Sequence, residues 1–152
     1  MEATHTNDER VRIAADTPGL GLRKGRVLVA EDDDDTRRLI ARALRRYGYE
    51  VVEARNGVDL LSRIEATALP SAWREPSFTA IISDNLMPEL SGLDVLGVLG
   101  CAHWRVPFIV MSAFADRETR DEARALGATA FLEKPFRIEE LAAAVGAAAR
   151  AH

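Results

Sequence analysis

The chain has 152 residues, of which 47% are hydrophobic and 29% are charged, and it carries a net charge of −4 at pH 7. This length and balance favour one globular domain that buries about two-thirds of its unfolded surface. The slightly negative charge lacks the basic excess typical of nucleic-acid binding, so we expect no direct contact with nucleic acid. The single cysteine, Cys101, rules out an internal disulfide and is typical of a cytoplasmic protein. No apolar run reaches the roughly 18 residues needed to cross a bilayer, and we expect no membrane insertion.

The first 25 residues differ in composition from the rest of the chain. They contain four acids, four bases, few large apolar side chains and a break at Pro18–Gly19, which together predict a flexible N-terminal leader over 1–25. The remainder, 26–150, is expected to form one domain.

Within 26–150, apolar runs alternate with polar segments of helical period. This order is typical of βα units that build a parallel sheet. It predicts five strands, at 26–30, 49–53, 78–83, 107–111 and 129–132. It also predicts five helices, at 34–47, 57–67, 91–100, 116–126 and 137–150. The predicted fold class is therefore α/β, a doubly wound (βα)5 parallel sheet with helices on both faces.

The first predicted helix has clear end signals. Acids at 33–35 stand where an N-cap and first-turn anions belong, and Arg45 and Arg46 stand at the opposite end, where cations favour the helix dipole. Its expected buried face consists of Leu39, Ile40, Ala43, Leu44 and Tyr47. The segment 69–77 contains two prolines and is expected to be a long surface loop.

Charged side chains follow three of the predicted strands. Glu31 and Asp32 come after the first strand, Asp84 after the third and Lys134 after the fifth. Because the carboxyl ends of parallel strands meet at one edge of a sheet, we expect these four residues to converge there. Such a cluster suggests a site for a divalent cation, a phosphate, or both.

The residue types narrow the chemistry. Carboxylates suit Mg²⁺, whereas a simple helix cap needs only one acid, so Glu31 and Asp32 are the candidate ligands. Asp84 is either a third ligand or a nucleophile that forms an acyl phosphate. The structural alternative is an aspartate that only stabilises a turn by bonding its own backbone. Lys134 is a compact cation able to reach a phosphate oxygen, although a Lys–Pro pair is by itself more often just a loop. Proline at position 135 raises the chance of a cis bond to about 5%. Ser112 places a hydroxyl at the same edge, but the sequence offers it no histidine base.

Taken in order, the segments VLVAEDDDDTRRLI, IISDNLMPELSGLDVL, FIVMSAFAD and GATAFLEKPF resemble the receiver domain of two-component response regulators. The resemblance covers about residues 26–150 and implies a flavodoxin-like fold with strand order 2-1-3-4-5. The resemblance implies that Asp84 is the phosphoacceptor and that Mg²⁺ is bound by Glu31, Asp32, Asp84 and the backbone carbonyl of Leu86. It also implies that Lys134 contacts the phosphate, that Ser112 is the switch hydroxyl and that Phe131 is the switch aromatic.

The resemblance also implies a function. A sensor histidine kinase or histidine phosphotransferase would supply the phosphate, and a downstream protein would read a changed surface on helix 116–126, strand 129–132 and helix 137–150. The chain would then act as a stand-alone receiver, catalysing only its own phosphorylation and slow dephosphorylation. Slow hydrolysis is expected because Leu86 and Phe114, which flank the path of the attacking water, are both apolar. Glu31 replaces the commoner Asp, and Ser112 replaces the commoner Thr.

Three alternatives stay open on the sequence. One is a Mg²⁺-dependent phosphatase with an aspartyl nucleophile, which also places acids at strand ends. Another is a flavodoxin-type cofactor binder, disfavoured because no Ser/Thr/Gly-rich phosphate loop follows the first strand. The last is a receiver that forms part of a larger regulator.

Overall fold

A computed structural model of the chain describes residues 24–74 and 76–151. Almost all of the expected leader, 1–25, lies outside these residues; only Lys24 and Gly25 are described, and Gly25 already belongs to the first strand. Among the described residues, no helix combines the length and the apolar character that crossing a membrane requires.

Five parallel strands form one sheet. They are β1 (Gly25–Ala30), β2 (Tyr49–Ala54), β3 (Ala80–Asp84), β4 (Phe108–Ser112) and β5 (Ala130–Glu133). Their order is β2-β1-β3-β4-β5, and every pairing is parallel. The predicted strand order is therefore confirmed, and the predicted bounds are displaced by one or two residues. The largest displacement is in β3, which begins at Ala80 and ends on Asp84 itself.

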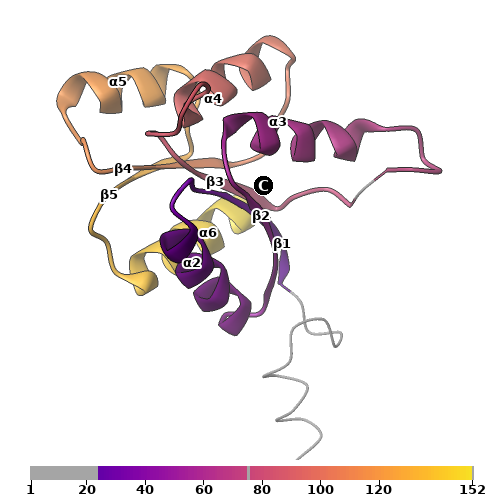
Figure 1. Cartoon of the computed structure of the whole chain (residues 1–152), viewed down its shortest axis with the longest axis horizontal. Helices are drawn as coiled ribbons and strands as arrows, with labels where there is room; N and C mark the ends of the chain where they lie inside the picture. Colours follow the sequence, from indigo (N-terminus) through magenta and orange to yellow (C-terminus); the bar gives the residue numbers. More distant parts are fainter. Residues whose placement is uncertain (1–23, 75, 152) are drawn as a thin grey trace, which may run out of the picture.

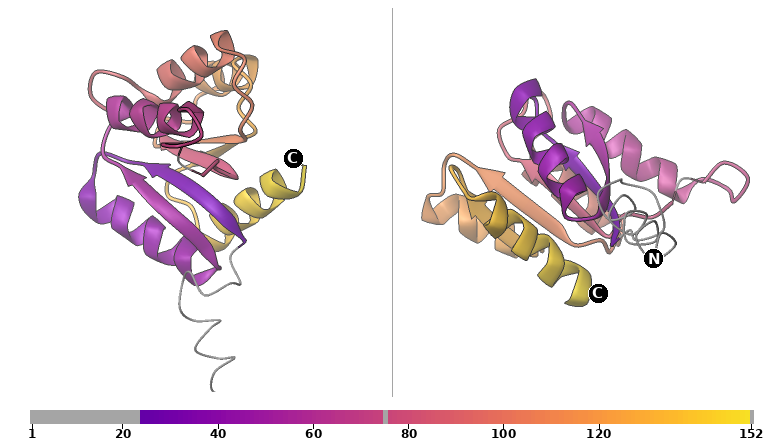
Figure 2. Two further views of the ribbon diagram at one scale, coloured as in Figure 1. Left: turned by 90° about the vertical axis from the view of Figure 1, so that its right-hand side faces the viewer. Right: turned by 90° about the horizontal axis from the view of Figure 1, so that it is seen from below.

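The helices cover both faces of the sheet. They are α2 (Asp34–Arg46), α3 (Gly57–Glu65), α4 (Gly92–Cys101), α5 (Arg117–Ala125) and α6 (Ile138–Ala151), with a short 3-10 turn, η1 (Ala66–Ala68), after α3. Helices α3, α4 and α5 lie on one face, and α2 and α6 lie on the other (Figures 1 and 2). The fold is the predicted flavodoxin-like α/β sandwich.

Strand alternation divides the hydrophobic core into two layers. Leu28 and Ala30 of β1 pack with the layer under α3, α4 and α5, whereas Val27 and Val29 pack with the layer over α2 and α6. This follows from the two-residue period of a strand, in which successive side chains point to opposite faces. The same alternation determines which face the polar residues at the strand ends belong to.

The buried face of α2 differs from the predicted one. Its buried residues are Arg37, Ile40, Ala41 and Leu44, which follow the i, i+3, i+4, i+7 spacing of a single helical face. Leu39 is 61% exposed and Tyr47 is 37% exposed, so the prediction was wrong for these two side chains. The error arose because the apolar residues of this helix spread over more than one face, and an arginine occupies the first buried position.

Polar caps fix where the helices begin. Asp33, Asn56, Ser91 and Asp116 each accept a backbone N–H from the first turn of the helix that follows, which satisfies a donor that has no partner within the helix. The predicted cap at 33 and the predicted helix start after Asn56 are confirmed. In the expected 69–77 loop, Leu69 to Arg74 contains no helix or strand.

The start of α3 packs tightly against the loop before α4. A Cβ atom on Gly57 would lie 2.1 Å from the carbonyl oxygen of Leu90, which is backbone and cannot turn aside. We therefore predict that Gly57→Ala lowers the free energy of unfolding by about 1–3 kcal/mol. Gly100→Ala, in α4 with no atom within 4 Å of its Cβ position, is the matched control. It should raise stability by up to about 1 kcal/mol through helix propensity.

Urea unfolding of both variants measures these effects. Equal stabilities for the two alanine variants would show that α3 can move away from Leu90 at no cost.

Candidate functional site

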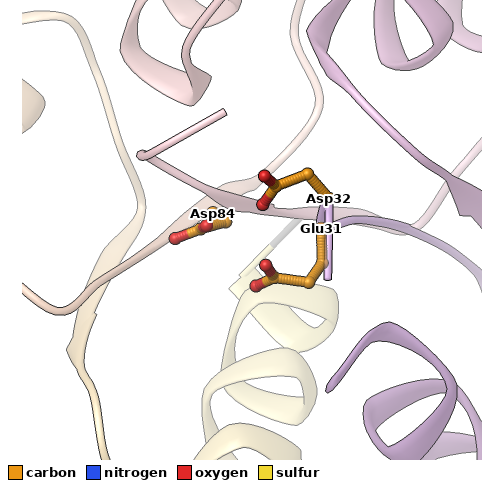
Figure 3. Close-up of side chains that lie close together, drawn as sticks. All are labelled: Glu31, Asp32 and Asp84. Carbon is orange, nitrogen blue, oxygen red and sulfur yellow. The ribbon is translucent and has the colours of Figure 1, made fainter. Parts of the chain in front are cut away.

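Four charged residues converge at the carboxyl edge of the sheet. Glu31 and Asp32 leave the end of β1, and their carboxylates point toward Asp84 at the end of β3 (Figure 3). One carboxylate oxygen from each of the three acids lies within 4.8 Å of the other two. Glu31 and Asp84 are buried, whereas Asp32 is exposed. The predicted cluster of acids is therefore present.

Lys134 completes the cluster from the far end of the chain. It follows β5, and its ammonium Nζ donates to Glu31 Oε2 at 2.7 Å and lies 3.2 Å from Asp84 Oδ1. The peptide bond between Lys134 and Pro135 is cis. One ammonium thus bridges two buried carboxylates that come from different strands.

Burial and charge act in opposite directions on these groups. Burial lowers the pKa of Lys134, but the hydrogen bond to Glu31 and the charge of Asp84 outweigh it, so the pKa is raised and the ammonium stays charged. Burial and the neighbouring Asp84 raise the pKa of Glu31 despite the bond to Lys134. With three acids and one lysine, the cluster carries a formal excess of negative charge.

Every polar group of Glu31 has a partner. Its N–H donates to the Ala54 carbonyl at 3.2 Å, and its carbonyl accepts from Arg37 Nη1 at 2.9 Å. Its Oε1 accepts the backbone N–H of Asp33 at 3.3 Å, and its Oε2 accepts from Lys134. Sequence reasoning missed Arg37. The signal that identifies it is its place in the i, i+3, i+4, i+7 series of buried α2 residues.

Asp84 is held by its own backbone surroundings. Its carbonyl accepts the Ser83 hydroxyl at 3.0 Å. Gly92, the first residue of α4, packs so closely on it that a Cβ there would lie 2.8 Å from the same carbonyl oxygen. The end of β3 and the start of α4 are thus in direct contact.

The two predicted switch residues lie beside this cluster. Ser112 is buried at the end of β4, where its hydroxyl donates to the Phe114 carbonyl at 3.0 Å and accepts the Phe114 N–H at 3.1 Å. Phe131, in β5, is half-buried, and the Arg120 guanidinium lies 4.9 Å from its ring centre. Ser112 is therefore bonded to the loop after β4, and Phe131 contacts α5.

Arg120 is the second residue that sequence reasoning missed. Besides stacking on Phe131, it donates to the Ala115 carbonyl at 3.2 Å and to Glu133 at 3.3 Å. These bonds connect α5, β5 and the loop after Ser112. The sequence contains no local signal for the contacts with β5, because Phe131 and Glu133 lie more than ten residues away in the chain.

The acidic cluster fits a small divalent cation. Two oxygens on opposite sides of one Mg²⁺ are about 4.2 Å apart, close to the span observed here, and a bridging water could complete the ligand set. Hard carboxylate oxygens are the donors that Mg²⁺ prefers, and the excess negative charge would be offset by a cation.

Comparisons with known proteins identify the family. Residues 27–146 match the family model of the response regulator receiver domain. The chain belongs to this family. It is 38% identical over 130 residues to the transcriptional regulatory protein PrrA of Mycobacterium tuberculosis, covering 86% of this chain and 52% of PrrA. It is 32% identical over 138 residues to the sensor kinase CckA of Brucella abortus, covering 91% of this chain and 13% of CckA.

Solved receiver structures have the same fold. The receiver domain of the Francisella response regulator 1452 matches with a TM-score of 0.75 and 27% identity, over 84% of this chain and 98% of that one. The match covers almost all of a solved receiver domain, whereas the chain spans only about half of PrrA and a small part of CckA.

The geometry makes a prediction for metal binding. Asp32→Ala should weaken Mg²⁺ binding by about tenfold or more, because it removes one of the three converging carboxylates. Its stability should change little, because Asp32 is exposed. Isothermal titration with Mg²⁺ at fixed ionic strength measures the dissociation constant.

Asp35→Ala is the matched control for the charge change. Asp35 is an exposed acid in the first turn of α2, and its removal should alter the dissociation constant less than about twofold. Equal losses from the two variants would contradict the assignment of Asp32 as a ligand.

Proposed function

We propose that this domain is a phosphoacceptor receiver in which Asp84 takes a phosphoryl group from a phosphohistidine of a sensor histidine kinase or histidine phosphotransferase. The observation that carries the proposal is the buried Asp84 carboxylate, paired with Lys134 at 3.2 Å and flanked by Glu31 and Asp32. Membership of the receiver family supports the same assignment. An aspartate with only a turn-forming role would not require two further acids and an ammonium beside it.

The residues suit an in-line transfer. An oxygen of Asp84 forms a bond to phosphorus while the bond from phosphorus to the imidazole nitrogen breaks, and the imidazole leaves with the electron pair. Lys134, already beside Asp84, can hold the transferring oxygens through its ammonium. Mg²⁺, when held by Glu31, Asp32, Asp84 and the backbone carbonyl of Leu86, supplies further neutralisation of phosphoryl charge.

The proposed response passes through Ser112 and Phe131. A phosphoryl group on Asp84 would compete with Phe114 for the Ser112 hydroxyl, and thereby move the loop after β4. Arg120 links that loop to β5 and to the Phe131 ring, so a displaced loop would alter these contacts. The surface formed by α5, β5 and α6 would then present a different face to a downstream protein, as a shift between two populated states.

The wider setting is part of the proposal. These steps would take place in the cytoplasm, and the net charge of −4 supports protein partners rather than direct contact of this domain with nucleic acid. The same chemistry serves a receiver that acts alone and one that belongs to a longer regulator.

Phosphorylation of Asp84 can be tested directly. With Mg²⁺ and phosphoramidate as a small phosphodonor, wild-type protein should gain the mass of one phosphoryl group, and Asp84→Asn should gain none, because its amide is not a nucleophile. Asp121→Asn, which changes an exposed acid of α5, should be labelled like the wild type. Intact-protein mass spectrometry reads the result.

Two outcomes would contradict this assignment. Labelling of Asp84→Asn at the wild-type rate would show that another residue is the phosphoacceptor. Sustained turnover of small phosphate esters without a lasting adduct would favour the Mg²⁺-dependent phosphatase instead.

The lifetime of the acyl phosphate is a separate prediction. Leu86, two residues after Asp84, is 50% exposed, and Phe114, two residues after Ser112, is 63% exposed. The proposal places both apolar side chains beside the path of the attacking water. We expect slow hydrolysis in the wild type and several-fold faster loss of phosphate in Leu86→Asn, whose amide can orient a water. The decay of the adduct mass after removal of the donor measures the rate.

Leu69→Asn, at a half-exposed leucine in the loop after η1, controls for the added amide and should leave the lifetime unchanged. Rapid loss of phosphate from the wild-type protein, with no phosphatase present, would contradict the expectation.

A further inference from the structure

Arg37 is a buried cation that the proposed phosphoryl transfer does not use. It lies on the sheet side of α2 and is only 3% exposed. A buried charge is costly unless its donors are satisfied. The guanidinium has two carboxylate partners, Asp34 at 2.6 Å and Glu53 at 3.3 Å, and these already balance its charge. Its third partner is neutral: Nη1 donates to the carbonyl oxygen of Glu31 at 2.9 Å.

This third bond fixes the peptide that carries two acids of the cluster. The N–H of Glu31 is tied to Ala54 in β2, and its carbonyl is tied to Arg37. The carbonyl of Glu31 belongs to the peptide between Glu31 and Asp32, so the plane of that peptide cannot turn without breaking the buried hydrogen bond from Arg37. The directions in which the two carboxylates leave the backbone depend on that plane.

We propose that Arg37 is a positioning residue for divalent-cation binding, acting through the backbone of Glu31 rather than through its own charge. The inference rests on the proposed function, because it takes Glu31 and Asp32 as the cation ligands. Groups that orient metal ligands in this way commonly affect metal affinity by about 10- to 100-fold.

The direction in which Mg²⁺ affinity changes when Arg37 is removed distinguishes a positioning role from an electrostatic one. Arg37 is a positive charge close to a cation site, so its removal would strengthen Mg²⁺ binding if charge alone mattered. Positioning requires the opposite, because a peptide free to turn no longer presents the two carboxylates together. A purely structural role would lower the stability of the domain and leave the affinity of the folded protein unchanged.

The test is Mg²⁺ titration calorimetry on the full chain at fixed ionic strength, with urea unfolding to show that each variant is folded. Arg37→Met should raise the dissociation constant by about tenfold or more. Arg38→Met removes a neighbouring exposed arginine and should leave the constant unchanged or slightly lower. Glu53→Gln removes an ion pair of Arg37 on the β2 side but keeps the bond to the Glu31 carbonyl, and should change the constant less than about twofold.

Arg37→Lys keeps the charge but lacks the planar fork that reaches several acceptors at once, so it should weaken binding by an intermediate amount. This variant decides the question if Arg37→Met does not fold. Wild-type affinity, or tighter binding, in the folded Arg37 variants would overturn the inference and leave the proposed function standing. A wild-type protein that binds no Mg²⁺ would overturn the metal site itself, and the inference with it.

Discussion

One ammonium group holds together the edge of the sheet on which the site is built. Lys134 bridges Glu31, which is 103 positions earlier in the chain, and Asp84, at the end of the central strand β3. Asp32 lies within 4.8 Å of these two acids, so three acids meet beside one lysine and the site retains a formal excess of negative charge. Buried carboxylates are costly without such a partner. Lys134 follows β5, so the turn after β5 must lie beside the ends of β1 and β3 for the buried carboxylates to be paired. The same pairing keeps Asp84 next to a positive charge.

Strand alternation separates the groups that react from the groups that respond. Glu31 and Asp84 continue the series of β1 and β3 side chains that pack toward α2 and α6. Ser112 and Phe131 continue the opposite series, and Phe131 packs against the layer under α3, α4 and α5. In the proposed mechanism, phosphorylation of Asp84 on one side of the sheet changes the contacts of Ser112 and Phe131 on the other side, through the backbone at the strand ends. The short loop 113–116, which is bonded to Ser112 at the end of β4 and to Arg120 of α5, is where these two sets of contacts meet.

A second feature is how completely Glu31 is constrained. β2, α2, Asp33 and Lys134 each satisfy one of its polar groups, so the acid is oriented before any ligand arrives. Such preorganisation is what a metal or phosphate site requires, because binding then costs little reordering. This chain matches about half of a transcriptional regulatory protein and a small part of a sensor kinase. A site that is complete within one small domain suits that modular use.

The sequence by itself determined the alternation of strands and helices and the residues at the strand ends, and its resemblance to receiver domains implied the strand order. Alternating apolar runs and helical segments admit few topologies, and parallel strands must place Glu31, Asp32, Asp84 and Lys134 at one edge, so both the fold and this cluster were predicted. The sequence did not determine which face of α2 is buried, because Leu39 and Tyr47 are apolar and yet exposed. Nor did it reveal Arg37 or Arg120, whose partners are brought together only by folding. Local pattern decides what a segment can form, but the pairing of buried charges depends on which segments become neighbours, and only the tertiary structure sets that.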